Sequence, residues 1–220
     1  MIQGVIFDAD GTLLDSMPYW DASVISMVTS MGVTPEKGLT EILTPMSMTE
    51  GAEYLIKRYG LTISADEIVA EENRRAEEFY ETKVSLKKGV SDLLKLLYTN
   101  GIRLAVATAT DKYLIDKALK KTGILSYFDA VLSCGDIGQG KSSPTIFYKA
   151  CEIMKTEPQF TVVTDDSLTA ITTAKKYGFK TAAVYDDMQK KFWNEMCSLG
   201  DLLIPSEFDK DIFKEFFMND

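Results

Sequence analysis

The chain has 220 residues, 45% of them hydrophobic, which is enough to bury the core of one large domain or of a domain with a smaller insertion. A net charge of −9 and an isoelectric point near 4.7 argue against nucleic acid and anionic membranes as partners. The sequence has no histidine, which excludes Ser-His-Asp triads and histidine-ligated metals and leaves hard, oxygen-preferring ions such as magnesium as the expected metals.

The three cysteines, Cys134, Cys151 and Cys197, are widely spaced and lack the spacing of a metal site or a disulfide framework. We expect free thiols in a reducing compartment. No charged and apolar leader opens the sequence, and no apolar run approaches the length of a membrane span. These features predict a cytoplasmic protein without a membrane partner. The oligomeric state is not determined by the sequence, and a monomer is the default expectation.

A short apolar run, Ile2 to Phe7, predicts a strand buried on both faces. Two carboxylates, Asp8 and Asp10, follow it directly and lead into a turn at Gly11. Ligands of open α/β sheets bind beyond the carboxyl ends of the strands, so this placement suits a catalytic pair. The alternative interpretation is a polar strand end with an Asx turn.

Residues 17–82 carry apolar side chains at helical spacing and no convincing strand. The first predicted helix runs from Met17 to Met31. A second helix start is predicted at Thr34-Pro35-Glu36, with an N-cap residue followed by proline in the first turn. A helix ending at Gly60 follows, and Ser64 to Glu67 predicts a capping box that opens the next helix.

From about residue 89 onward, helices and strands alternate, which predicts a doubly wound parallel sheet. The expected fold is therefore an α/β core of residues 1–16 and 84–220 with an all-helical domain, residues 17–83, inserted after the first strand. Leu202-Leu203-Ile204 is assigned to amphipathic helical pieces of the C-terminal tail. No chemistry is predicted for segment 187–220. The predicted core elements are the strands 102–107, 130–133, 160–164 and 181–184 and the helices 90–98, 111–122, 144–154 and 168–177.

Polar side chains also stand at the carboxyl ends of later predicted strands and in one loop between them. Thr108 ends the strand from Ile102, and Asp165-Asp166 ends the strand from Phe160. Lys141 lies in a glycine-containing loop before a helix. Each has an ordinary interpretation alone: a helix cap, a solvated lysine, or a turn leading into a helix. Their arrival at successive strand ends, in this order, favours a phosphoryl-transfer site.

The string Asp8-Ala9-Asp10-Gly11-Thr12-Leu13-Leu14-Asp15-Ser16 resembles the first motif of the haloacid dehalogenase-like (HAD) phosphohydrolases. Thr108, Lys141 in Gly-Lys-Ser-Ser-Pro-Thr-Ile-Phe, and Asp165-Asp166-Ser167 are similar to the second, third and fourth motifs of that superfamily. The resemblance runs from Gly4 to about Val184. The helical insertion resembles the cap of the β-phosphoglucomutase-like subgroup.

The resemblance implies a magnesium-dependent phosphatase that acts on a small phosphorylated metabolite, with a sugar phosphate as one candidate. Asp8 would be the nucleophile and Asp10 the general acid and base. Lys141, Thr108 and the backbone amides near Ala9, Asp10 and Ala109 would hold the phosphoryl oxygens. Magnesium would be bound by Asp8, by the Asp10 carbonyl, and by Asp165 and Asp166. An aspartate at position 10 favours phosphoryl chemistry over dehalogenation, which has no leaving oxygen to protonate.

Four cap residues are candidates for substrate selection: Tyr19, Trp20, Met46 and Ser47. Packing within the cap is an equally good interpretation of Trp20 and Met46. Residues 39–51 contain no Arg, Lys or His. A mutase must retain a doubly phosphorylated intermediate, so this absence favours a phosphatase over the alternative, a β-phosphoglucomutase-like sugar-phosphate mutase. A more remote alternative is a non-catalytic phospho-acceptor domain.

Overall fold

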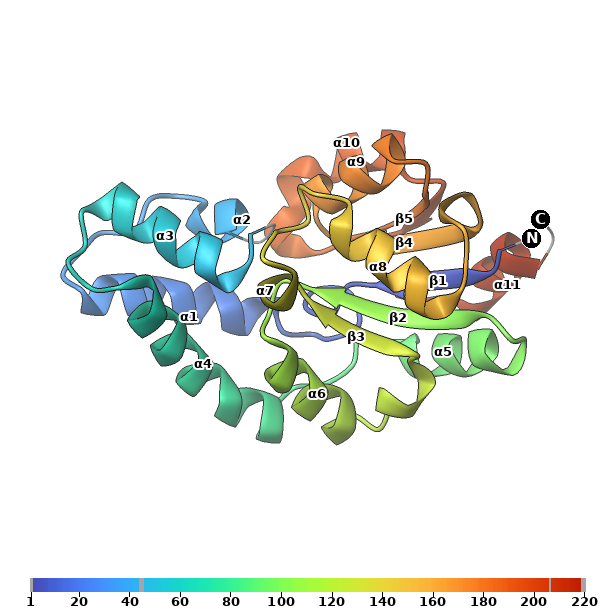
Figure 1. Cartoon of the computed structure of the whole chain (residues 1–220), viewed down its shortest axis with the longest axis horizontal. Coiled ribbons are helices and arrows are strands. Elements are labelled where there is room, and N and C mark those ends of the chain that lie inside the picture. The colour runs from blue at the N-terminus through green and yellow to red at the C-terminus, as the bar shows by residue number, and fades with distance from the viewer. Residues whose placement is uncertain (1, 44–45, 206, 219–220) are drawn as a thin grey trace.

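The computed structural model describes residues 2–43, 46–205 and 207–218 as an α/β core beside a layer of helices (Figure 1). The strands are β1 (Gly4–Phe7), β2 (Arg103–Thr108), β3 (Ala130–Ser133), β4 (Thr161–Asp165), β5 (Lys180–Val184) and β6 (Leu202–Ile204). The core helices are α5 (Val90–Thr99), α6 (Lys112–Lys121), α7 (Cys134–Ile137), α8 (Thr145–Met154), α9 (Leu168–Lys176), α10 (Trp193–Leu199) and α11 (Lys210–Met218). Short 3-10 helices lie at η1 (Leu125–Tyr127), η2 (Pro158–Phe160) and η3 (Asp187–Phe192).

The strands form one parallel sheet in the order β3-β2-β1-β4-β5-β6. The predicted doubly wound α/β fold is therefore confirmed. β1 lies at the centre, with Ile6 opposite Ala105 of β2 on one side and Val163 of β4 on the other. Because all strands run the same way, the carboxyl ends of β1, β2 and β4 meet at one edge of the sheet.

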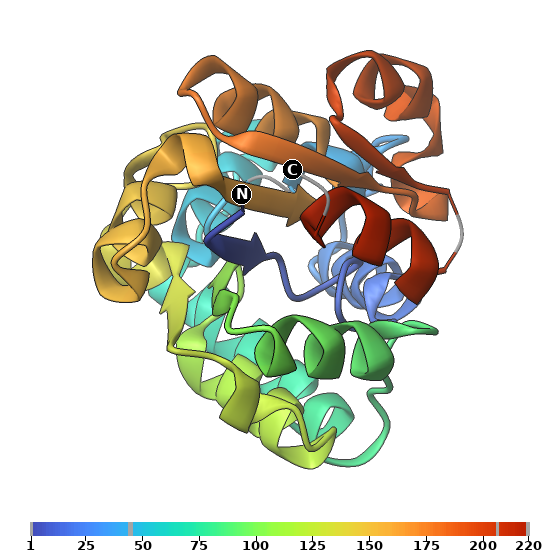
Figure 2. The same cartoon turned by 90° about the vertical axis from the view of Figure 1, so that its right-hand side faces the viewer.

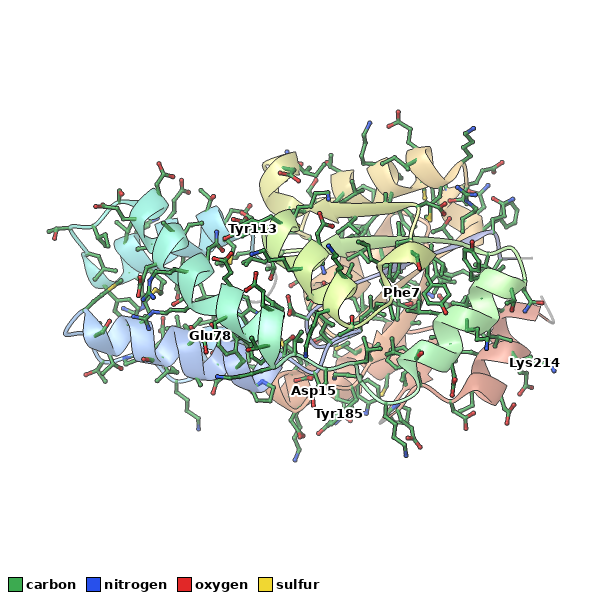
Figure 3. All side chains as sticks on the ribbon, turned by 90° about the horizontal axis from the view of Figure 1, so that it is seen from below. Phe7, Asp15, Glu78, Tyr113, Tyr185 and Lys214 are labelled. Carbon is green, nitrogen blue, oxygen red and sulfur yellow. The ribbon has the colours of Figure 1, made fainter. Side chains whose placement is uncertain are left out.

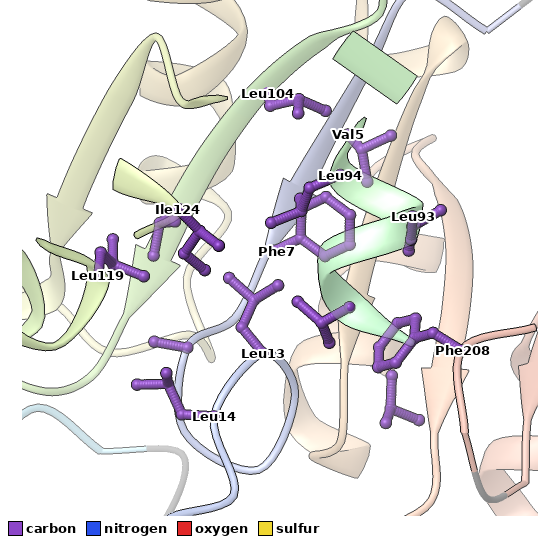
Figure 4. Close-up of a cluster of buried hydrophobic side chains, with 14 of the residues drawn as sticks. Val5, Phe7, Leu13, Leu14, Leu93, Leu94, Leu104, Leu119, Ile124 and Phe208 are labelled. Carbon is purple, nitrogen blue, oxygen red and sulfur yellow. The ribbon is translucent and has the colours of Figure 1, made fainter. Parts of the chain in front are cut away.

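Both faces of β1 are buried, which explains its uninterrupted apolar sequence. Val5 and Phe7 face a cluster that includes residues of α5, α6 and α11, whereas Ile6 belongs to the cluster formed with α8 and α9. Figure 2 shows the sheet between these helical layers. Figure 3 places Phe7 in this interior, and Figure 4 shows it beside Val5, Leu94 and Leu13.

The segment between β1 and α5 folds into α1 (Met17–Ser30), α2 (Leu39–Leu43), α3 (Met48–Tyr59) and α4 (Ala65–Thr82). The predicted capping box at the start of α4 is confirmed. Ser64 Oγ accepts from the Glu67 amide at 3.3 Å, and the Ser64 amide donates to Glu67 Oε2 at 3.0 Å. These helices enclose an apolar cluster of their own, whose buried members are Val24, Met27, Val28, Leu39, Ala52, Leu55 and Ile68.

Two chain segments connect the helical insertion to the core, and they pair with each other. The Asp15 amide donates to the Ser85 carbonyl at 2.9 Å, and the Lys87 amide donates to the Leu13 carbonyl at 2.9 Å. This pairing holds α1–α4 beyond the carboxyl ends of the strands, as Figure 1 shows. The predicted cap inserted after the first strand is thus confirmed, while its exact domain boundaries, 17–83 against 1–16 and 84–220, stay a prediction.

The predicted helix start at Thr34-Pro35-Glu36 is wrong. These residues belong to no helix or strand, and α2 begins only at Leu39, after Gly38 with a φ of +80°. The reason is a tertiary contact. The Glu36 amide donates to the Tyr59 hydroxyl at 2.9 Å, and its carboxylate binds Arg58, so Glu36 is held against α3.

The helical assignment of Leu202-Leu203-Ile204 is also wrong, because these residues form β6. They pair in parallel with Ala182, Ala183 and Val184 of β5. Leu202 and Ile204 are buried, whereas Leu203 is half-buried, which suits an edge strand. Among the described residues, no helix is both long enough and apolar enough to cross a membrane.

Candidate active site

The carboxyl ends of three adjacent strands bring the predicted site residues together. Asp8 follows β1 directly, and its amide donates to the Thr164 carbonyl at 2.9 Å, which continues the pairing with β4. Thr108 is the last residue of β2 and Asp165 the last of β4. All are buried, at 8% exposure for Asp8 and 1% for Thr108 and Asp165. The sheet order therefore builds a single polar site from segments far apart in the sequence.

Lys141 reaches this site from the loop before α8 and bridges two of its carboxylates. Its ammonium lies 2.5 Å from Asp8 Oδ1 and 2.9 Å from Asp165 Oδ2, and the residue is only 3% exposed. Burial alone would lower the pKa of Lys141, but the attraction of Asp165 and Asp8 outweighs it, so the pKa is raised and the ammonium stays charged. The amide and hydroxyl of Ser167 both donate to Asp165 Oδ1 at 2.8 Å.

Three buried carboxylates, Asp8, Asp165 and Asp166, each place an oxygen within 4.8 Å of the others. Burial is the largest cause that raises the pKa of Asp8, to about 7; Lys141 opposes this rise and Asp165 adds to it. Burial likewise raises the pKa of Asp166, and the nearby Asp8 and Asp165 raise it further. Lys141 is the one ammonium in contact with this cluster among the described residues, and carboxylate oxygens gathered in this way suit a bound cation.

Asp166 has one carboxylate oxygen that no other described group satisfies. Its Oδ1 accepts from the Thr12 hydroxyl at 3.1 Å, but its Oδ2 is buried without a hydrogen-bond partner. Gly11 closes over this oxygen with a φ of +79°, and a Cβ there would lie 2.5 Å from Asp166 Oδ2. A set of carboxylate oxygens with one unsatisfied acceptor suits a hard divalent cation such as magnesium.

The Asp10 carboxylate is outside this cluster and is held by three hydroxyl groups. Ser16 Oγ and the Tyr80 hydroxyl donate to Oδ1 at 2.6 Å each, and Thr110 Oγ1 donates to Oδ2 at 2.8 Å. Tyr80 belongs to α4, so a cap residue orients this core side chain. Sequence reasoning gave none of the three donors a role, although Ser16 lies within the first motif. Thr110 lies two residues after Thr108, which is a weak local signal, and Tyr80 is distant in the chain and offers none.

Replacing Tyr80 by phenylalanine is expected to destabilise the protein by about 1–3 kcal/mol, because buried polar groups lose their partners. The Tyr80 hydroxyl accepts from Trp20 Nε1 at 2.9 Å while it donates to Asp10, and Tyr80 is fully buried. Thermal denaturation measures the change. Tyr98→Phe, at a tyrosine that is 56% exposed, is the matched control. Equal melting temperatures for the two variants would contradict the expectation.

The residues predicted to bind phosphate lie around the same centre. Thr108 Oγ1 accepts from the Thr110 amide at 3.1 Å, which orients the hydroxyl, and Ala109 lines the cavity beside it. Ala9 is fully buried, and its carbonyl accepts from the amides of Leu13 and Leu14, which fixes the turn after β1. The phosphate-binding roles of these residues stay a prediction.

A cavity of about 110 Å³ extends from these residues into the cap. Asp8, Asp10, Thr108 and Lys141 line its inner end. The predicted specificity residues Trp20, Met46 and Ser47 line the cap side, but Tyr19 does not. The Tyr19 ring is instead stacked on Phe79 with centroids 4.1 Å apart. Sequence reasoning missed Glu72, which lines the cavity from α4 and looks in the sequence like any polar residue of a helix.

Comparison with known proteins agrees with this geometry. The haloacid dehalogenase-like hydrolase family matches residues 5–184, which include every predicted catalytic and metal-binding position. The chain belongs to this family. A Pseudomonas aeruginosa relative named phosphoglycolate phosphatase 1 is 30% identical over 82% of this chain and 68% of its own length. A Thermotoga maritima relative named phosphorylated carbohydrates phosphatase is 24% identical over 81% of this chain and 83% of its own.

Among solved structures, this HAD-like chain is similar to a β-phosphoglucomutase from Clostridium difficile. The TM-score is 0.82 at 20% identity, over 100% of this chain and 98% of the other. The predicted resemblance to the β-phosphoglucomutase-like subgroup is thus confirmed at the level of the fold. The family match and the curated relatives also confirm the predicted class of enzyme, since the chain is a HAD-like phosphatase.

Proposed function

We propose that this phosphatase hydrolyses a small phosphomonoester with magnesium, through a phosphoryl group transferred to Asp8. The observation that carries the proposal is the position of Asp8. It directly follows the central strand β1, contacts Lys141 at 2.5 Å, and lies in one buried cluster with Asp165 and Asp166. The chain has no histidine, so the carboxyl group of Asp10 is the best candidate for the acid-base steps.

The reaction proceeds in two displacements at phosphorus. An Asp8 carboxylate oxygen attacks in line, the bond to the leaving oxygen breaks, and Asp10 gives that oxygen its proton. Asp10 then takes a proton from the water that attacks the aspartyl-phosphate, which frees Asp8 and releases inorganic phosphate. Asp10 must leave at least part of its hydroxyl cluster to reach the leaving group. Until the substrate arrives, the three hydroxyl donors keep the Asp10 carboxylate in its present orientation.

The surrounding residues stabilise the transferred group. Lys141 and the Thr108 hydroxyl bind its oxygens, together with the amides near Ala9, Asp10 and Ala109. Asp8, Asp165 and Asp166, with the Asp10 carbonyl, are the groups that would hold magnesium. The bound ion would supply positive charge that offsets the repulsion between carboxylates and a phosphate dianion.

The substrate belongs to the small phosphorylated metabolites, and sugar phosphates are the first compounds to test. The names of the relatives, phosphorylated carbohydrates phosphatase and phosphoglycolate phosphatase, support this range. A sugar-phosphate mutase remains the second candidate, because the helical cap resembles that of the β-phosphoglucomutase-like subgroup. Against it, Lys141 is the one basic side chain among the described residues that line the cavity. A cytoplasmic location is part of the proposal, supported by the free cysteines Cys134, Cys151 and Cys197.

Removing the metal is expected to lower phosphate release from every good substrate by roughly a hundredfold or more, because the metal supplies several kcal/mol of charge stabilisation. The measurement is phosphate release from sugar phosphates, nucleotides and alkyl phosphates in magnesium and in EDTA, followed by re-addition of magnesium. Full activity in EDTA would contradict the metal assignment. Conversion of β-glucose 1-phosphate to glucose 6-phosphate without phosphate release would identify a mutase.

A further inference from the structure

The cavity becomes apolar as it leaves the phosphate-binding end. On the cap side it is lined mainly by methionine and branched aliphatic side chains, among them Met27, Met46, Met48, Leu55, Ile68 and Val69. A leaving group with many hydroxyls would bury most of them against these side chains, at a free-energy cost for each unmade hydrogen bond. The shape and lining therefore favour a leaving group with a largely aliphatic body.

The polar groups on the cap side are few and mostly engaged. Ser47 accepts from the Glu50 amide at the start of α3, and Thr40 donates to Asp21 at 2.6 Å. The exception is Glu72 of α4, which lines the cavity and is only 3% exposed.

One carboxylate oxygen of Glu72 is satisfied and the other is not. The Ser23 hydroxyl donates to Oε2 at 2.9 Å, whereas Oε1 is buried without a hydrogen-bond partner. Arg75, about one turn further along the same helix, is bound to Glu71 at 2.7 Å. Burial raises the pKa of Glu72, and the hydrogen bond from Ser23 and the charge of Arg75 oppose this rise only in part. Oε1 of Glu72 is thus a buried acceptor that a donor on a bound molecule could satisfy.

The charges along the cavity define what that donor can be. Lys141 lies at the opposite end and is bound to Asp8 and Asp165. Among the described lining residues no other cation is available for a second anionic group. A carboxylate or second phosphate on the leaving group would face Glu72 uncompensated, whereas a hydroxyl or ammonium would satisfy it.

We propose that the substrate is the phosphomonoester of a largely aliphatic alcohol that carries one hydrogen-bond donor, a hydroxyl or an ammonium, which binds Glu72 Oε1. This inference rests on the proposed phosphatase function and narrows its substrate range, away from the sugar phosphates and phosphorylated acids that the relatives' names suggest. It assigns Glu72 as the residue that selects the leaving group. The same residue excludes bisphosphates and phosphorylated acids.

The test compares alkyl phosphates of matched chain length that end in a methyl, hydroxyl, ammonium or carboxylate group. With magnesium present, kcat/KM is expected to be highest for the hydroxyl or ammonium compound. It is expected to be lowest for the carboxylate. The gap between the extremes is about tenfold to a hundredfold, the value of a hydrogen bond to a charged group. A larger gain for the ammonium compound identifies an amino alcohol phosphate, and a larger gain for the hydroxyl compound identifies a diol phosphate.

Glu72→Gln replaces the unpaired acceptor with an amide that can donate to an anion. Its ratio of kcat/KM for the ammonium compound over the carboxylate compound is expected to fall by about tenfold or more. Glu78→Gln is the matched control, since Glu78 lies on the same helix with an exposed side chain (Figure 3). Should Glu72→Gln not fold, Met48→Lys serves instead, because a cation on the cavity wall is expected to raise the carboxylate compound relative to the ammonium one.

The outcomes separate this inference from the proposed function. Phosphate release from none of the compounds would overturn the phosphatase proposal itself. Phosphate release from all of them, with a wild-type ratio near one or with a ratio unaltered by Glu72→Gln or Met48→Lys, would overturn only the role of Glu72. A wild-type preference for the carboxylate compound would overturn it as well.

Discussion

Asp8→Asn is expected to lower kcat by roughly a thousandfold or more, since an amide cannot serve as the nucleophile toward phosphorus. Asp8 is the carboxylate that ends the central strand and touches Lys141. The measurement is phosphate release with the best substrate of the wild type, in the presence of magnesium. The substitution keeps the shape of the side chain, so the fold is expected to persist.

The control for this variant is Asp15→Asn. Asp15 belongs to the same motif but is exposed on the connecting segment (Figure 3). Its replacement is expected to leave kcat close to the wild-type value. Substantial turnover by Asp8→Asn, or an equal loss in Asp15→Asn, would contradict the assignment of Asp8 as nucleophile.

The Asp8→Asn variant also allows an independent test, through the pH dependence of the free energy of unfolding. Burial raises the pKa of Asp8 from 3.8 to about 7 in the folded chain. Between these values the folded state retains a proton that the unfolded chain releases, so its contribution to stability falls as the pH rises. In EDTA, wild-type stability relative to Asp8→Asn is therefore expected to decrease from about pH 4 to about pH 7. Denaturant unfolding across this range measures the difference, and a flat or rising difference would be inconsistent with a raised pKa of Asp8 in the folded chain.

Lys141→Met is expected to destabilise the metal-free protein by about 3–5 kcal/mol, because it removes the one ammonium that contacts two buried carboxylates. The melting temperature should fall by roughly 10 °C for a chain of this size. The loss is expected to be smaller at low pH, where Asp8 takes up a proton, and smaller with magnesium bound. Turnover should also fall strongly, since the transferred phosphoryl group loses a cationic partner.

Lys149→Met is the matched control. Lys149 lies on the outer side of α8 and its ion pair with Glu152 is exposed on both sides. Its loss is expected to change the free energy of unfolding by less than about 0.5 kcal/mol. The proposed role of Lys141 would be contradicted by similar melting curves for the two variants in EDTA.

Much of the fold followed from local patterns. The apolar run from Ile2 to Phe7 predicted a central buried strand, and β1 has both faces covered. The alternation of strands and helices after residue 89 predicted the parallel sheet. Local patterns were insufficient where tertiary contacts decide. Glu36 is drawn out of a helix by Tyr59 and Arg58, and residues 202–204 are a strand because the edge of β5 is available to them.

The site could be predicted where topology fixes the location of a side chain. Residues at the ends of parallel strands meet at one edge, so Asp8, Thr108 and Asp165 converge whatever the intervening sequence. The partners of Asp10 could not be predicted in this way. Tyr80 reaches it from α4, and its hydroxyl is one of many polar groups on helices, with no local feature that sets it apart.

The sequence by itself determined which groups are available for the proposed chemistry, namely the carboxylates and the lysine, and the absence of histidine limits the metals that fit. These properties depend on the residue types and on their positions along the chain. The tertiary structure alone decided what surrounds the leaving group. Glu72 became distinctive only because α4 buries it at an apolar cavity with Oε1 unpartnered, and burial and missing partners are properties of packing.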